Sequence, residues 1–115
     1  MRKIYRGEIY YADLGYGEGS EQRGVRPVLI LQNDIGNEHS TTVIVAPFTT
    51  KRKKLMPTHM EISSVDNLCD MSVILLEQIR TIDKKRLKIM MGKISQDELS
   101  QVENCVNISL GLSVI

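Results

Sequence analysis

"VLILQNDIGNEHSTTVIVAPF", residues 28 to 48, decides the fold of this chain. It opens with VLILQ (residues 28–32), a continuous apolar run of strand length. It ends with TTVIVAPF (residues 41–48), a β-branched run of the kind found in strands. Between them, NDIGN (residues 33–37) has the composition of a turn. These runs predict strands of a mostly antiparallel sheet.

The flanking segments extend this prediction. Further strands are expected at residues 8–14, 58–62 and 72–82, the last being the longest, and DKKRL (residues 83–87) is expected to form one helical turn. Ser95 and Glu98 form a capping box, and apolar residues then recur at helical spacing, which predicts a helix from about Gln96 to Gly111. The sequence therefore predicts a small α+β fold that is mostly β: a strongly curved sheet or barrel followed by one packed C-terminal helix.

Length and composition restrict the class of protein. The chain has 115 residues, 42% hydrophobic and 25% charged, which predicts one globular domain over residues 1–115. Net charge is +1, so any binding of nucleic acid must depend on local placement of charge. No apolar run approaches the length of a membrane span and no signal peptide is recognised, so we expect a cytoplasmic protein without membrane contact. Cys69 and Cys105 are then expected to be free thiols.

The sequence does not favour a metal or a cofactor. His39 and His59 lie in different segments and no C-x-x-C pair occurs, so we expect no metal site and interpret both histidines as structural or surface residues. No glycine-rich loop is followed by a helix, which argues against nucleotide binding of the P-loop or dinucleotide type.

Two polar loops remain, GYGEGSEQRG (residues 15–24) and TTKRKKLMP (residues 49–57). Pro27 keeps the backbone of Arg26 extended at the foot of the first loop, and a guanidinium can fork onto phosphate oxygens. Thr49 stands at the foot of the second loop, so the two side chains can converge on one phosphate if their strands are neighbours. The alternative is structural: Arg26 pairs with Glu21 or Glu77, and Thr49 starts a turn. The KRKK cluster (residues 51–54) is either a solvated loop or a phosphate-facing edge.

The order and spacing of several motifs resemble the MazF/PemK family of bacterial toxins, over nearly the whole chain. The motifs are GSEQRGVRPVLILQND, VAPFTT, PTHMEI and SVILLEQIRTID. The resemblance implies an SH3-like barrel with a C-terminal helix, of the CcdB/PemK type. It also implies a sequence-specific endoribonuclease from a type II toxin–antitoxin system.

The resemblance assigns roles by position. Arg26 and Thr49 fall on the catalytic arginine and threonine, and Glu21 on a glutamate implicated in catalysis in some members. Ser20 and Gln22 share a loop that closes over RNA, and Gln78 falls where the RNA groove is lined. We add as RNA-binding candidates Arg23, which departs from the family, Tyr16 as a stacking residue, and Lys51. The stretch Ser63–Met71 matches no family pattern, so base preference is not transferred.

The family's chemistry needs no metal, because RNA supplies its own nucleophile, the 2′-hydroxyl. The implied partners are single-stranded RNA, a second copy of the chain, and a MazE-like antitoxin with a disordered acidic segment. Two other classes stay open: a CcdB-like toxin that binds DNA gyrase without catalysis, and an RNA-binding barrel without turnover.

Overall fold

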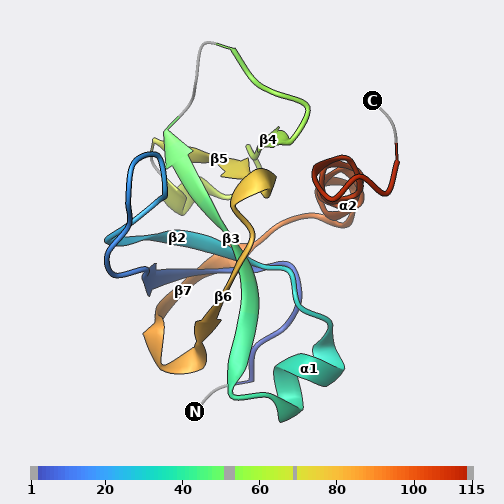
Figure 1. Cartoon of the computed structure of the whole chain (residues 1–115). Coiled ribbons are helices and arrows are strands. Elements are labelled where there is room, and N and C mark those ends of the chain that lie inside the picture. The colour runs from blue at the N-terminus through green and yellow to red at the C-terminus, as the bar shows by residue number, and fades with distance from the viewer. Residues whose placement is uncertain (1–2, 51–53, 69, 114–115) are drawn as a thin grey trace.

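The computed structural model describes residues 3–50, 54–68 and 70–113. This part of the chain forms a curved sheet with helix α2 packed against one side (Figure 1). The strands are β1 (Glu8–Asp13), β2 (Val25–Ile30), β3 (Thr42–Thr50), β4 (His59–Glu61), β5 (Met71–Leu75), β6 (Arg80–Asp83) and β7 (Leu87–Lys93). The α-helices are α1 (Asp34–His39) and α2 (Gln96–Ser109), and the 3₁₀ turns are η1 (Asp66–Leu68), η2 (Leu76–Gln78) and η3 (Lys84–Arg86).

The sheet is antiparallel, in the order β4-β5-β3-β2-β1-β7, with β6 also paired to β3. Its two faces bury separate apolar clusters. One cluster is formed within the curved sheet by residues such as Tyr10, Val28, Val45 and Ile82. The other is shared with α2 and contains Leu29, Phe48, Ile74, Val102 and Cys105. The predicted fold class, a mostly antiparallel curved sheet with a C-terminal helix, is confirmed.

The predicted single strand at residues 72–82 is wrong. It is divided into β5 and β6, which both pair with β3 and are separated by η2. Phe48 faces Ile74 and Val45 faces Arg80, so the β5–β6 side has three residues more than β3 over this interval. The turn η2 takes up the excess. Leu76 stays buried in the core, while the two residues that follow it leave the sheet.

The predicted turn at residues 33–37 is also wrong, because this segment starts helix α1. Asn33 caps the helix by accepting a hydrogen bond from the Gly36 amide at 2.8 Å. Asn37 is buried and donates to the Gln32 carbonyl at 2.9 Å. Side-chain hydrogen bonds of this kind stabilise a short helix in a segment whose composition is typical of a turn. Strand β7 was not anticipated, whereas the turn predicted at residues 83–87 is confirmed as η3.

Helix α2 agrees with the prediction from the sequence. Ser95 and Glu98 form both bonds of the capping box. Val102 and Cys105 are buried against the sheet. No helix in the described part of the chain is long and apolar enough to cross a membrane.

Candidate functional site

Arg26 and Thr49 lie on neighbouring strands. In the antiparallel pair β2–β3, Val28 faces Pro47, and the same register continued by two residues sets Arg26 opposite Thr49. The Arg26 guanidinium donates from Nη1 to the carbonyl oxygen of Phe48 at 3.2 Å, one peptide before Thr49. Its Nε donates to the Arg23 carbonyl oxygen at 3.0 Å. The predicted adjacency of the two residues is therefore confirmed.

The partners of Arg26 are neutral carbonyls. Arg26, Glu21 and Glu77 are all described residues, and no ion pair joins the arginine to either carboxylate. Partial burial lowers the pKa of the Arg26 guanidinium, through desolvation, but an arginine remains charged at neutral pH. Thr49 does not start a turn, since it lies half-buried inside β3. The cation is thus fixed in place without being neutralised, which suits it to bind an anion.

The loop between β1 and β2 is held by three other arginines. Arg80 donates to the Leu14 carbonyl at 3.3 Å and Arg86 to the Asp13 carbonyl at 3.0 Å. Arg23 donates to the Gly17 carbonyl at 3.4 Å. These hydrogen bonds go to backbone oxygens, so they do not neutralise the three guanidinium charges.

Four of the predicted residues line one open hollow of about 660 Å³: Ser20, Glu21 and Gln22 from the loop, and Gln78 from η2. Glu77, Ile79, Arg80 and Thr81 complete its wall. The Glu21 carboxylate and the Arg26 guanidinium are not hydrogen-bonded to each other in this structure. Its Oε1 accepts from the Glu18 amide at 2.6 Å.

Arg26 and Thr49 are not among the residues that line this hollow, and neither are the other predicted residues that the structure describes, Tyr16 and Arg23. Tyr16 is 93% exposed, so nearly all of its side chain is open to solvent. Arg23 is exposed at the end of the loop. Lys51 lies outside the described residues.

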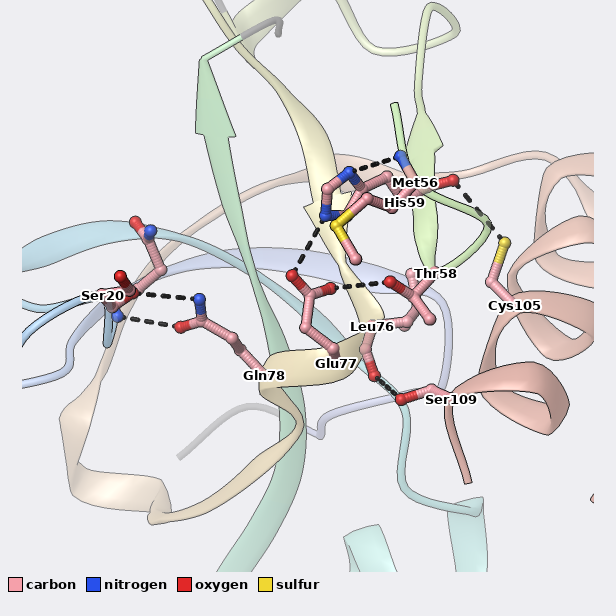
Figure 2. A network of polar contacts seen from close by, with 10 residues as sticks. Ser20, Met56, Thr58, His59, Leu76, Glu77, Gln78, Cys105 and Ser109 are labelled. Atoms are coloured by element: carbon pink, nitrogen blue, oxygen red, sulfur yellow. Dashed lines mark hydrogen bonds and ion pairs between the residues drawn. The ribbon is translucent and has the colours of Figure 1, made fainter. Parts of the chain in front are cut away.

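Turn η2 carries two residues with extensive hydrogen bonding, shown in Figure 2. Glu77 accepts from the Thr58 hydroxyl and is bonded to His59 Nε2. Gln78 bonds both to the Ser20 carbonyl and to the Gln22 amide.

Reasoning from the sequence missed Glu77 and Arg80 as wall residues. The motif LEQIRT contained both, but its apolar neighbours were interpreted as one continuous strand. The turn at η2, which directs these side chains to the hollow, has no glycine or proline to reveal it.

The histidines lie where the sequence analysis expected. His59 is buried and His39 is exposed at the end of α1. Among the described residues, no group of three His, Cys, Asp or Glu side chains converges as metal ligands would. Cys105 is a free, buried thiol.

A curved antiparallel sheet with a C-terminal helix, which carries an arginine held by neutral carbonyls, defines a small, mostly β protein with an anchored cation. A family model described as PemK-like, MazF-like toxin of type II toxin–antitoxin system matches residues 5–110. The chain belongs to this family.

Individual relatives agree with this assignment. The chain is 54% identical over 112 residues to "Endoribonuclease MazF" of Staphylococcus epidermidis, covering 96% of this chain and 93% of that protein. It is similar to an endoribonuclease in complex with its cognate antitoxin from Mycobacterial species, with 27% identity and a TM-score of 0.81. That match covers 97% of this chain and 99% of the other. MazF from Deinococcus radiodurans shares the fold, with 22% identity and a TM-score of 0.82, over 96% of this chain and 99% of its own.

Proposed function

We propose that this chain is a sequence-specific endoribonuclease toxin of a type II toxin–antitoxin system, acting in the cytoplasm as one toxin domain over residues 1–115. One observation carries the proposal. The Arg26 guanidinium is anchored by two neutral carbonyls, those of Arg23 and of Phe48, and Phe48 directly precedes Thr49. Its charge and its other N–H groups remain for a phosphate.

The reaction requires no group from outside the protein and the RNA. The 2′-oxygen attacks the adjacent phosphorus, the new O2′–P bond forms, and the P–O5′ bond breaks. The products are a 2′,3′-cyclic phosphate, or the 3′-phosphate after hydrolysis, and a 5′-hydroxyl. One proton leaves the 2′-hydroxyl and one reaches the departing 5′-oxygen.

The chain's residues divide this work. Arg26 stabilises the negative charge that grows on the phosphate, and Thr49 donates a hydrogen bond to a phosphate oxygen. Glu21 is our candidate base for the 2′-hydroxyl proton. It has to exchange its hydrogen bond with the Glu18 amide for one with the substrate.

RNA is proposed to run along the hollow beside the loop. Ser20, Gln22 and Gln78 would meet the strand in the hollow, while Tyr16, Arg23 and Lys51 would contact it outside. Single-stranded RNA exposes its bases to such loop contacts.

We propose a homodimer as the active form and a MazE-like antitoxin as its inhibitor. An apolar hollow of about 530 Å³ supports the dimer. Its apolar wall consists of Leu31, Ile44, Ile79, Val106 and Leu110. Ile44 is 39% exposed and Leu110 is 60% exposed, which is costly for a monomer. Light scattering on the wild type and on Ile44→Lys tests this proposal. The molar mass in solution should be twice the chain mass for the wild type and should fall toward one chain mass for the variant.

The test of the activity is incubation of the pure protein with a long RNA in EDTA. Discrete fragments with 5′-hydroxyl ends are expected, and their ends give the recognition sequence. An oligonucleotide with a single 2′-deoxy nucleotide at the mapped site should bind without being cut. Cleavage of that oligonucleotide would refute the mechanism. Intact RNA together with inhibition of gyrase would instead support the CcdB-like alternative, and intact RNA that stays bound would support a barrel without turnover.

A further inference from the structure

The amide of Gln78 bridges the two residues on either side of Glu21. Its Oε1 accepts from the Gln22 amide at 2.9 Å, and its Nε2 donates to the Ser20 carbonyl at 3.1 Å (Figure 2). Both ends of the Gln78 side chain are therefore engaged by the backbone of the loop. Each end makes one such bond, so one N–H of Nε2 and one lone pair of Oε1 stay available for RNA in the hollow that Gln78 lines.

We propose that Gln78 is a positioning residue that clasps this loop, and that Glu77, bonded to the buried His59, fixes the position of Gln78. The proposal rests on the proposed function, because the clasped loop carries the candidate base Glu21. It assigns no chemical step to the three residues.

The pair His59–Glu77 has a defined proton arrangement. The Met56 amide donates to His59 Nδ1 at 3.0 Å, so in the neutral ring the proton is on Nε2. That nitrogen donates to Glu77 Oε2 at 3.0 Å, and the Thr58 hydroxyl donates to Oε1 at 3.1 Å. The His59 side chain is 1% exposed, so this end of the network is anchored in the protein interior.

The pKa of Glu77 lies below the ordinary carboxyl value, which favours the ionised carboxylate. Desolvation raises the pKa, but a backbone hydrogen bond and the bonds from His59 and Thr58 outweigh it and lower the pKa overall. A carboxylate with its oxygens engaged in this way is a poor proton acceptor and a good anchor.

Turn η2 is also fixed through its main chain. The Leu76 amide donates to the Thr58 carbonyl at 3.0 Å, and the Ser109 hydroxyl donates to the Leu76 carbonyl at 2.7 Å. Strand β4 and helix α2 thus hold the start of η2, and Glu77 holds its middle. Gln78 follows directly, so its amide stands at a set position relative to the loop.

This arrangement predicts an effect at a distance. The hydrogen bonds of the Glu77 side chain go to Thr58 and His59, not to the loop. Removing its carboxylate should nevertheless loosen the loop, because Gln78 loses its fixed support.

The test is amide hydrogen exchange, measured by NMR on the RNA-free protein at the Gln22 amide. We expect Gln78→Ala and Glu77→Ala each to speed this exchange about tenfold, a factor that corresponds to about 1.4 kcal/mol of lost hydrogen bonding. Glu77→Gln should stay near the wild type, because an amide keeps a contact to His59 and one to Thr58.

Glu98→Ala is the matched control. The Glu98 carboxylate also has a lowered pKa. Desolvation raises the pKa, but the hydrogen bonds from Ser64, Ser63 and Ser95 outweigh desolvation. It caps α2, and its hydrogen bonds go to Ser63, Ser64 and Ser95 and not to the loop, so its loss should cost stability without changing exchange at Gln22.

Unchanged exchange at Gln22 in Gln78→Ala would overturn the clasp. A response in Gln78→Ala but not in Glu77→Ala would overturn the role of the His59–Glu77 pair, and an equal response in Glu98→Ala would reduce the effect to general loss of stability. In RNA cleavage, the double variant Glu77→Ala/Gln78→Ala should lose no more rate than the more impaired single variant. A double variant whose loss equals the product of the two single losses would contradict the proposal. Exchange is measured without RNA, so it tests the clasp independently of the proposed function. If the protein did not cleave RNA, the proposed function would fail, and the exchange rates would still decide whether the clasp exists.

Discussion

Replacing Arg26 by lysine tests whether the site needs a forked cation or only a positive charge. A guanidinium has five N–H donors, and in this structure Nε–H and one Nη1–H are bonded to the Arg23 and Phe48 carbonyls. Three donors are left, and a two-point contact to phosphate oxygens uses two of them. A lysine ammonium carries its three donors on one nitrogen. It cannot reach both carbonyls and also fork onto a phosphate.

The size of the effect follows from this count. Removing one donor that stabilises charge in a transition state costs about 2.7–4 kcal/mol, or 10²–10³ in rate. Because lysine keeps the charge and loses the fork, we expect a fall near the lower end of that range, about 100-fold in kcat. The guanidinium is only half-buried and the freed carbonyls can be hydrated, so the melting temperature should change by no more than a few degrees.

The assay is single-turnover cleavage of a short RNA that carries a fluorophore and a quencher, built on a site mapped in a long RNA. With enzyme in excess, the plateau rate reports the chemical step alone. Arg86→Lys is the control, since Arg86 also donates to a loop carbonyl, that of Asp13 at 3.0 Å, and should keep a rate within about threefold of the wild type. A rate for Arg26→Lys within that same factor would show that charge suffices, and the argument from the fork would be wrong.

Two further predictions concern ionisation. The lowered pKa of Glu77 means that its ionised form stabilises the folded state above the ordinary carboxyl pKa, and that this contribution is lost as pH falls through the folded value. The difference in melting temperature between the wild type and Glu77→Gln should therefore be widest near neutral pH and shrink on acidification. A difference that grew on acidification would contradict this sign. Burial raises the pKa of the Cys105 thiol, so in a Cys69→Ser background a thiol reagent at about pH 8 should modify the folded chain at least about 100-fold more slowly than the chain in denaturant. Equal rates would mean that the thiol is accessible in the folded state.

Local sequence signals predicted the elements whose stability is local. The capping box of Ser95 and Glu98 defined the start of α2, a continuous apolar run located β2, and a β-branched run located β3. The break at η2 was missed because Leu76 is apolar and continues the strand pattern, while the reason for the turn lies in β4 and α2. Helix α1 was missed because turn-forming residues such as Asn33 also cap helices, and the choice depends on the buried contacts of Asn37.

The site shows the same division. Family resemblance indicated Arg26 and Thr49, and the β2–β3 register alone accounts for their meeting. The clasp of Gln78 could not be predicted, because its partners are a backbone carbonyl and a backbone amide. Such atoms occur at nearly every residue, so a contact with them leaves no trace in the sequence pattern. For this reason the resemblance placed Gln78 at the RNA, whereas the structure connects it to the loop.

The site therefore consists of a fixed half and an adjustable half. Arg26 and Thr49 stand on paired strands whose inner residues are buried, so in the proposed mechanism the position for the phosphate is set before RNA arrives. Glu21 stands on a loop that Gln78 holds at two points, and its carboxylate is occupied by the Glu18 amide at an exposed site. Exchanging an exposed hydrogen bond costs little, because water or substrate can replace it. Moving the loop as a whole would cost the two bonds of the clasp as well. RNA binding should thus release the Glu21 side chain while the backbone on either side of it stays in place, which lets one loop bind the substrate and position a base within the same small hollow.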